Sequence, residues 1–358
     1  YDVIIHDLTE IIYIIQRPKT ENNDNRILKF KDLNDWEKEL KSIKTKNYAE
    51  IIIYNFLYPC ADFNSGILFK KLKILNAKNI GFLNAGTFNV NYSSSFISFL
   101  HLRKIIHHVI LNLKHYRTLL KLKKHGFIYY GFLVGSLSEY RNLYLSKLKL
   151  KTKIISGHCW DISNLYSKKY ASNFEAKGFG VLLDGAGPKF ENDEKYLNIK
   201  QTLTSEKWYP RLCLLFDYLE SKFNINILIK GHYSVLHPVN PDYFGKREVF
   251  NDSLVELIKN SSVVMTRKST ALILAIYFKK PILIVTSNEL RKNKSNKLYQ
   301  NKISKYLECS LINIDDCHFL NKITKVKDKK RLNFLKYFGS FSNLETSNTL
   351  LIIEDLKK

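Results

Sequence analysis

Short apolar runs rich in β-branched and aromatic residues alternate with longer amphipathic stretches along the chain. In the first half the apolar runs cover residues 3–5, 51–54, 80–83, 127–131 and 154–156. Runs of this length predict buried strands, and the helical stretches between them predict that the strands pair in parallel.

The second half repeats this rhythm more regularly. Strands predicted at 180–183, 226–229, 262–265 and 281–285 are separated by helices predicted near 206–223, 253–260 and 269–278. A chain of 358 residues exceeds the size at which a single core usually stops growing. We therefore expect an α/β protein of two Rossmann-like, doubly wound domains, residues 1–168 and 169–335, that face each other across a cleft.

The charge is strongly positive, because 57 Lys and Arg residues against 33 Asp and Glu residues give a formal net charge of +24. With 45% hydrophobic residues the chain is too apolar to be disordered. The charge therefore indicates an anionic partner, such as nucleic acid, an anionic membrane or a phosphorylated substrate. A segment rich in Lys and Asn at 291–302 is interpreted as a surface loop.

Residues 63–138 include no Asp or Glu. Within this stretch, the spacing of apolar and basic residues over 96–124 predicts one or two amphipathic cationic helices. Such a helix either packs on the core with a solvated basic face or lies on an anionic membrane, where each nearby cation contributes about 1 kcal/mol. The cations that would face the lipid are Lys114, Arg117, Lys121 and Lys124.

Cysteine usage and hydropathy bear on the compartment. The five Cys residues include no CxxC pair, which argues against a disulfide framework and a structural zinc site and favours a reducing cytoplasm. No apolar run approaches the roughly 18 to 20 residues that span a bilayer. We expect a cytoplasmic protein that is peripheral on the inner face of the cytoplasmic membrane.

Polar residues follow one predicted strand of the second domain. Lys230, Gly231 and His232 come directly after the strand at 226–229, and His237 follows in an irregular segment. A His at the carboxyl end of a strand can donate a hydrogen bond to a phosphate, although a His in such a place is more often structural.

A second polar segment, Arg267, Lys268, Ser269 and Thr270, follows the strand at 262–265 and opens the next predicted helix. Ser269 is a natural N-cap, and capping alone would explain it. A helix N-terminus with two hydroxyl groups and two cations is also suited to an anion. The presence of both segments in one α/β domain favours phosphate binding.

Several segments of the second half resemble the donor-binding half of bacterial surface-carbohydrate glycosyltransferases, which act in capsule and lipopolysaccharide synthesis and have the GT-B fold. The segments are 244–249, 254–261, 269–271, 278–282 and 286–290. Their order and spacing agree over roughly residues 160–290. The His and Ser/Thr motifs are similar to those of transferases that use CMP-activated sialic acid or Kdo.

This resemblance implies roles for individual residues. His232 or His237 would face the nucleotide phosphate, because Tyr233 stands where relatives tend to have Pro and His237 precedes Pro238. Ser269 and Thr270 would hold phosphate oxygens. The other donor-binding candidates are Lys230, Arg247, Arg267, Lys268, Gly185 and Gly187. We expect no metal or other cofactor, because His232 and the Ser269/Thr270 helix end would take the place of a metal. The resemblance also implies that a helix in residues 336–358 packs back on the first domain.

Two carboxylates are candidates for the base that takes the proton of the acceptor hydroxyl. Asp184 comes where the strand at 180–183 meets a Gly-rich turn, and the resemblance places an acidic motif there. Asp161 is the competitor and has His158 close by in sequence. Turn chemistry is the alternative explanation of either Asp. We favour Asp184 as the base, and the catalytic candidates are Asp184, Asp161 and His232.

The sequence is therefore interpreted as that of a metal-independent glycosyltransferase. The expected donor is a nucleotide sugar, with a CMP-sugar favoured and a UDP-sugar next, and the acceptor is a surface glycan or a lipid-linked glycan. A sugar-nucleotide 2-epimerase and a glycerol-phosphate-type polymerase remain alternatives. Nucleic-acid binding is the alternative from another class, although no RRM, KH, zinc-finger or helix-turn-helix signature is present.

Overall fold

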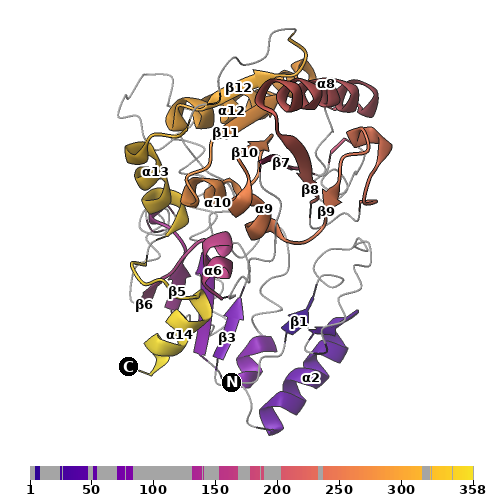
Figure 1. The fold of residues 1–358 in the computed structure, drawn as a ribbon. Coiled ribbons are helices and arrows are strands. Elements are labelled where there is room, and N and C mark those ends of the chain that lie inside the picture. The colour runs from indigo at the N-terminus through magenta and orange to yellow at the C-terminus, as the bar shows by residue number, and fades with distance from the viewer. Residues whose placement is uncertain are drawn as a thin grey trace. The chain divides into compact units, whose positions relative to one another are not determined.

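The computed structural model describes residues 5–8, 25, 27–46, 51–54, 71–76, 78–83, 131–138, 140, 153–167, 178–185, 187–188, 203–232, 237–316, 323, 325–340 and 342–357. These residues belong to two compact units, each with a parallel sheet (Figure 1). The prediction of an α/β fold with parallel sheets is confirmed.

The units divide the chain differently from the predicted domains. Unit 1 holds the described residues up to 157 together with 351–357, and unit 2 holds the described residues from 158 to 350. Helix α6 (Trp160–Ser167) therefore belongs to unit 2, although the sequence analysis placed it in the first domain.

Unit 1 has a four-stranded parallel sheet in the order β3-β4-β5-β6. Its strands are β3 (Ile51–Tyr54), β4 (Lys78–Leu83), β5 (Gly131–Val134) and β6 (Lys153–Ser156). The other elements are the parallel pair β1 (Ile5–Asp7) and β2 (Ile27–Lys29), helix α2 (Leu33–Thr45) and the short helix η1 (Lys73–Leu75). Strand β5 is buried at all four positions, and residues 127–130 of the strand predicted at 127–131 lie outside the described residues.

The sheet of unit 1 is covered in part by the end of the chain. Helix α14 (Asn348–Leu356) brings Ile352 into a buried cluster with Ile80, Phe82, Leu133 and Ile155. Lys153 Nζ lies 2.8 Å from an oxygen of Asp355. Helix α14, near the end of the chain, therefore contributes to the core of unit 1, whose other strands and helices come from residues before 158.

Unit 2 has a six-stranded sheet in the order β12-β11-β10-β7-β8-β9, and all its pairs are parallel. The strands are β7 (Phe179–Leu183), β8 (Asn226–Lys230), β9 (Val249–Phe250), β10 (Val263–Thr266), β11 (Ile282–Thr286) and β12 (Ser310–Asn313). Neither β9 nor β12 was predicted from the sequence.

Helices cover both faces of this sheet (Figure 1). Helix α8 (Ser205–Phe223) packs on the face that carries Leu182, Met265 and Leu283. The opposite face carries Val181 and Val264. It is covered by α6, α9 (Leu254–Asn260), α10 (Leu272–Tyr277), α12 (Lys294–Leu307) and α13 (Asp328–Phe334). Alternate residues of each strand thus enter two cores, which is why the strands read as continuous apolar runs.

The segment at 291–302 is helical, so its interpretation as a loop was wrong. Helix α11 (Asn288–Lys292) is followed by α12, whose N-cap Asn293 accepts hydrogen bonds from the backbone N–H groups of Ser295 and Asn296. Ile303 and Leu307 are fully buried. These two residues lie one turn apart near the end of α12 and pack it on the core. The helix was not predicted because the segment 291–302 is rich in Lys and Asn.

Candidate active site

The sheet of unit 2 has a topological switch point between β7 and β10. When strands β7 to β12 are numbered 1 to 6 in chain order, their order across the sheet from β9 to β12 is 3-2-1-4-5-6. This is the strand order of dinucleotide-binding folds. The connections after β7 and β10 lead to opposite edges of the sheet. Ligands of such sheets bind outside the carboxyl ends of the strands at this point. The candidate active site is therefore defined by the residues that follow β7, β8 and β10.

Arg267 links the ends of the two strands that flank the switch point. Its Nη2 donates a 2.7 Å hydrogen bond to the carbonyl of Gly185, and its guanidinium lies 5.9 Å from the ring centroid of Trp208. Its own carbonyl accepts from Gln300 Nε2 at 3.2 Å. A Cβ at position 185 would lie 2.7 Å from Nη2, so Gly185 provides the room for the guanidinium. A half-buried cation is thus fixed at the switch point.

Asp184 and His237 form a buried pair next to this cation. The side chain of Asp184 is 5% exposed and that of His237 is fully buried. His237 Nε2 lies 3.5 Å from Asp184 Oδ2, and His237 Nδ1 lies 2.9 Å from the hydroxyl of Tyr243. Both ring nitrogens of His237 are therefore directed at protein groups.

Lys230 is held by backbone carbonyls beside this pair. Its Nζ donates to the carbonyl of Gly231 at 2.5 Å and to that of Asn251 at 2.9 Å. Burial lowers the pKa of Lys230, and the nearby carboxylates of Asp252 and Asp184 offset part of this effect. Lys230 thus supplies positive charge to the site while its ammonium group fixes the backbone after β8 and β9.

His232 follows Gly231 and is half-buried. It belongs to the same carboxyl edge as Asp184 and Arg267. His237 is engaged with Asp184 and Tyr243, so the two predicted histidines lie in different surroundings. The phosphate contact itself stays a prediction.

The turn before α10 differs in part from its prediction. The N-cap of α10 is Ala271, not Ser269, and the helix begins at Leu272. Ser269 Oγ accepts a 3.2 Å hydrogen bond from the N–H of Ala271, which is a local capping role. Thr270 is exposed, and the exposed Lys268 has its Nζ 5.4 Å from the ring centroid of Tyr299. The contacts of Ser269 and Thr270 with a phosphate stay predictions.

Asp161 lies in the first turn of α6, which packs against α10. Its carboxyl group is hydrogen-bonded to Thr270, and burial raises its pKa to about 6. His158 is turned to other partners: its Nδ1 lies 2.8 Å from Ser340 Oγ, and its N–H donates to Asn348. The structure thus brings Asp161 to the predicted Ser/Thr segment but does not pair it with His158.

The raised pKa of Asp161 predicts a pH dependence of stability. Between about 3.9, the usual Asp value, and about 6, the folded chain keeps a proton that the unfolded chain has lost. Stability should therefore fall as the pH rises through this window and then level off. Asp161→Asn should stabilise unit 2 by up to about 3 kcal/mol at pH 7 and flatten this dependence. Thermal unfolding at pH 4.5 and 7.5 measures both effects, and a variant with the wild-type pH dependence would contradict them.

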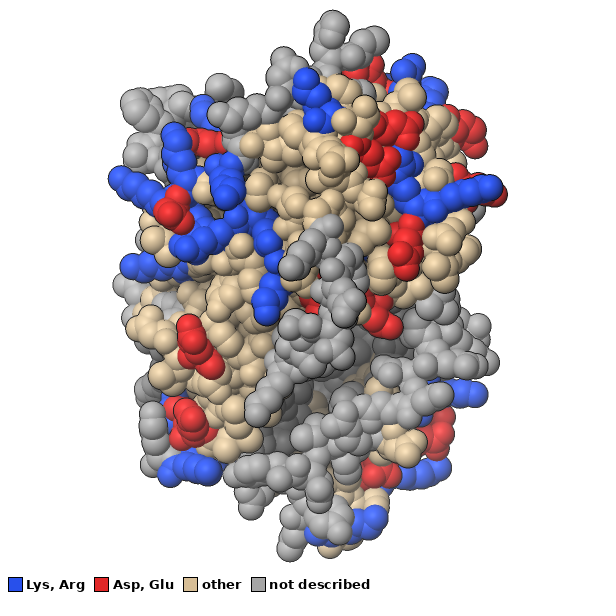
Figure 2. Space-filling view, viewed as in Figure 1, with Lys and Arg blue, Asp and Glu red and all other residues tan. Residues whose placement is uncertain are grey.

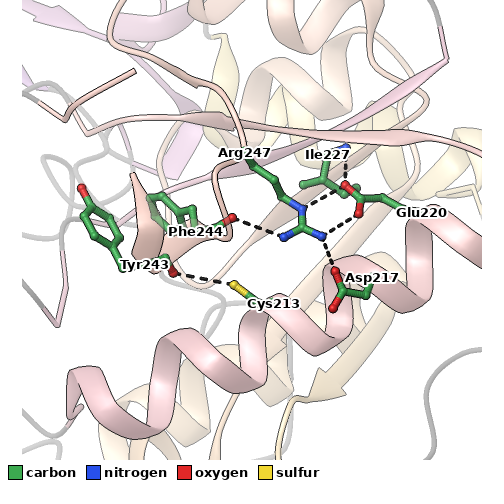
Figure 3. Close-up of polar contacts among 7 residues, drawn as sticks. All are labelled: Cys213, Asp217, Glu220, Ile227, Tyr243, Phe244 and Arg247. Carbon is green, nitrogen blue, oxygen red and sulfur yellow. Dashed lines mark hydrogen bonds and ion pairs between the residues drawn. The ribbon is translucent and has the colours of Figure 1, made fainter. Parts of the chain in front are cut away.

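Arg247 is a predicted donor-binding residue that the structure places in a partly exposed ion-pair cluster (Figure 3). Its Nε and Nη2 donate to Glu220 at 2.9 and 2.6 Å, and Nη2 also donates to Asp217 at 2.5 Å. Glu220 further accepts the N–H of Ile227 at 3.0 Å. The Arg247 side chain is 11% exposed. Its guanidinium ties the segment before β9 to α8, and its contact with a donor stays a prediction.

The remaining predicted residues fall partly outside the described residues. Gly187 is buried after the Asp184 turn, and its approach to a ligand stays a prediction. The predicted membrane-facing residues Lys114, Arg117, Lys121 and Lys124 lie outside the described residues. In the described part of the chain, no three His, Cys, Asp or Glu side chains are grouped to hold a metal ion. No described helix combines the length and apolar character that a membrane crossing requires.

Sequence reasoning missed four residues that shape the site: Trp208, Tyr243, Asn251 and Gln300. Trp208 and Gln300 contact Arg267. Asn251 binds the backbone of His237 through both of its side-chain polar atoms. Asn251 directly follows strand β9, and a polar residue at a strand end is a signal that sequence reasoning can use. The signal was missed because β9 has only two residues and was not recognised as a strand.

No protein-family model matches the chain, and no curated protein matches its sequence. Solved structures to which it is similar include a glycosyltransferase of kitacinnamycin, with a TM-score of 0.38 and 11% identity over 79% of this chain and 68% of that one. The spinosyn forosaminyltransferase SpnP gives 0.37 and 13% over 84% and 70%. The glycosyltransferase SnogD from Streptomyces nogalater gives 0.37 and 9% over 77% and 64%. Scores and identities this low establish neither a family nor a function.

Proposed function

We propose that this chain is a glycosyltransferase that moves a sugar from a nucleotide-sugar donor to a surface-glycan or lipid-linked acceptor. The observation that supports it is the grouping of Asp184, Lys230, His232 and Arg267 at the carboxyl edge of a 3-2-1-4-5-6 sheet. A carboxylate beside several cationic or hydrogen-bonding groups suits proton removal from a hydroxyl next to a departing phosphate. A CMP-sugar is favoured and a UDP-sugar is next, as the sequence resemblance implies.

In the proposed reaction, Asp184 takes the proton of the acceptor hydroxyl while that oxygen bonds to the anomeric carbon. The bond between this carbon and the donor phosphate breaks, and the nucleotide leaves with the electron pair. His232 and Arg267 stabilise the negative charge that develops on the leaving phosphate. These groups supply the charge that a metal ion would otherwise provide, so the proposed reaction is metal-independent.

Nucleotide binding is the first test of this proposal. A ligand at about 100 times its Kd adds about 2.7 kcal/mol of stability, which raises Tm by several degrees. We expect CMP to give this shift, and His232→Ala to reduce both the shift and the rate of transfer, the latter by about ten- to a thousandfold. A response to UDP alone points to a UDP-sugar transferase or a 2-epimerase, and one to CDP-glycerol points to the polymerase. Stabilisation by an oligonucleotide alone would overturn the proposal.

We further propose that the protein works in the cytoplasm, peripherally on the inner face of the cytoplasmic membrane. The net charge of +24 supports this proposal. A described basic face adds to it: Lys297 and Lys305 of α12 flank the exposed Leu298, and Lys329 and Lys336 flank the exposed Leu332 of α13. Figure 2 shows Lys and Arg side chains gathered on the left of unit 2, where Figure 1 draws these helices.

Co-sedimentation with anionic vesicles tests the membrane proposal. Neutralising Lys114, Arg117, Lys121 and Lys124 to Gln should weaken binding sharply, because each contributes about 1 kcal/mol near the lipid. The matched variant neutralises the four lysines of the basic face and changes the net charge equally. A loss only in the matched variant would move the contact to α12 and α13, and no loss in either would reject membrane binding.

A further inference from the structure

The ring of His237 is oriented by partners on both sides. A neutral imidazole carries one N–H and one acceptor nitrogen, whereas a carboxylate only accepts hydrogen bonds. Nε2 faces Asp184 at 3.5 Å, beyond hydrogen-bond geometry, and Nδ1 faces the Tyr243 hydroxyl at 2.9 Å. For a neutral ring, one tautomer suits both contacts: Tyr243 would donate to Nδ1, and Nε2 would carry the proton that faces Asp184.

Tyr243 is suited to be the hydrogen-bond donor in the series of contacts from Tyr243 through His237 to Asp184. Burial raises the pKa of its hydroxyl, and the negative charge of Asp184 raises it further, so the phenol keeps its proton. The short helix η4 (Asp242–Phe244) carries Tyr243, whose ring centroid lies 4.9 Å from those of both Tyr209 and Phe244. Because Tyr209 belongs to α8, the hydroxyl is held by the packing of that helix.

The backbone at His237 is fixed as firmly as its ring. Asn251 Nδ2 donates to the carbonyl of His237 at 3.2 Å, and Asn251 Oδ1 accepts from its N–H at 3.4 Å. A Cβ at position 231 would lie 2.9 Å from His237 Cδ2, so Gly231 leaves the space that the ring fills. The ends of β8 and β9 therefore hold the imidazole in place against Asp184.

We propose that Tyr243 and His237 are positioning residues that act through Asp184. The chain from Tyr243 to His237 to Asp184 fixes the tautomer of His237 and directs its N–H at Asp184 Oδ2, which sets the orientation of the carboxylate toward the acceptor hydroxyl. At 3.5 Å the last contact is long for a hydrogen bond, so the chain orients the carboxylate rather than clamping it. This inference rests on the proposed function and assigns His237 a role other than contact with the phosphate.

Tyr243→Phe tests the chain, and Tyr209→Phe is its matched control because it removes a buried hydroxyl from the neighbouring ring. Nitrogen-15 NMR of histidine-labelled protein reads the tautomer, with His237→Gln identifying the signal. We expect the wild type and Tyr209→Phe to carry the proton at Nε2, and Tyr243→Phe to lose this preference. A proton at Nδ1 in the wild type, or an unchanged tautomer in Tyr243→Phe, would overturn the chain.

Kinetics test whether the chain serves transfer. Losing one neutral hydrogen bond corresponds to about a tenfold effect, so kcat should fall about tenfold in Tyr243→Phe while the KM for the donor stays within about twofold. His237→Gln, whose amide can still donate to Asp184, should keep more activity than His237→Ala. An unchanged kcat together with an altered tautomer would reject the positioning role. If no nucleotide stabilises the protein, the proposed function fails. The NMR result then still decides whether Tyr243 sets the tautomer of His237.

Discussion

Replacing Asp184 by Asn lowers the rate of sugar transfer by about 100- to 10,000-fold, if this carboxylate is the base as proposed. Asn has the same shape but cannot accept the proton of the acceptor hydroxyl. Its amide can also keep a polar contact with His237, whose Nε2 lies 3.5 Å from Asp184 Oδ2. The fold and the stabilisation by nucleotide should therefore persist while kcat falls.

The same measurements on Asp161→Asn separate the two candidate bases. A pKa of about 6 suits a group that takes up a proton near neutral pH, so Asp161 is a serious competitor. We expect Asp161→Asn to retain most of the activity of the wild type. A collapse of kcat in Asp161→Asn with normal turnover in Asp184→Asn would exchange their roles.

Arg247→Met is expected to destabilise unit 2 by about 3 to 4 kcal/mol without altering nucleotide binding. The substitution leaves Glu220, whose side chain is 29% exposed, without its guanidinium partner and removes the stacking of the cation 5.1 Å from the Phe216 ring centroid. For a unit of this size the loss lowers Tm by about 10 °C. Thermal unfolding with and without CMP measures the stability and the binding separately.

Arg331→Met is the matched control for this prediction. Arg331 is 12% exposed, close to the 11% of Arg247, but its ion-pair partner Asp328 is 74% exposed. A single pair with an exposed carboxylate contributes about 1 kcal/mol or less. Equal destabilisation by the two substitutions would show that side-chain packing, and not the ion-pair cluster, accounts for the effect. Loss of the CMP-induced shift in Arg247→Met would place Arg247 in the donor site.

The strands of unit 2 were predictable because both faces of the sheet are buried. The run Gly180–Leu183 is buried throughout, and Ile227 and Ile229 are buried in the neighbouring strand, so short apolar runs rich in β-branched residues predicted these central strands. Strand β9 escaped prediction because it has two residues. Helix α12 escaped because its exposed lysines outnumber the buried residues, such as Ile303 and Leu307, that hold it in place.

The site was predictable at the level of strand ends but not of contacts. Asp184 and Arg267 were found because each follows an apolar strand, and the parallel sheet brings such positions to one edge. The role of Arg247 was missed because its partners lie on α8, 27 and 30 residues earlier in the chain. His237 presents the same difficulty, since only tertiary packing sets its ring between Asp184 and Tyr243.

The contribution of α14 to the core of unit 1 has a consequence for folding during translation. Ile352 fills a core whose other members, Ile80, Phe82, Leu133 and Ile155, are synthesised far earlier. Ile352 can join this core only after the whole of unit 2 has left the ribosome, because unit 2 lies between the two parts of unit 1 in the sequence. A fragment that stops at residue 157 would lack this side chain, so we expect its sheet to be less stable than that of unit 1 in the whole chain.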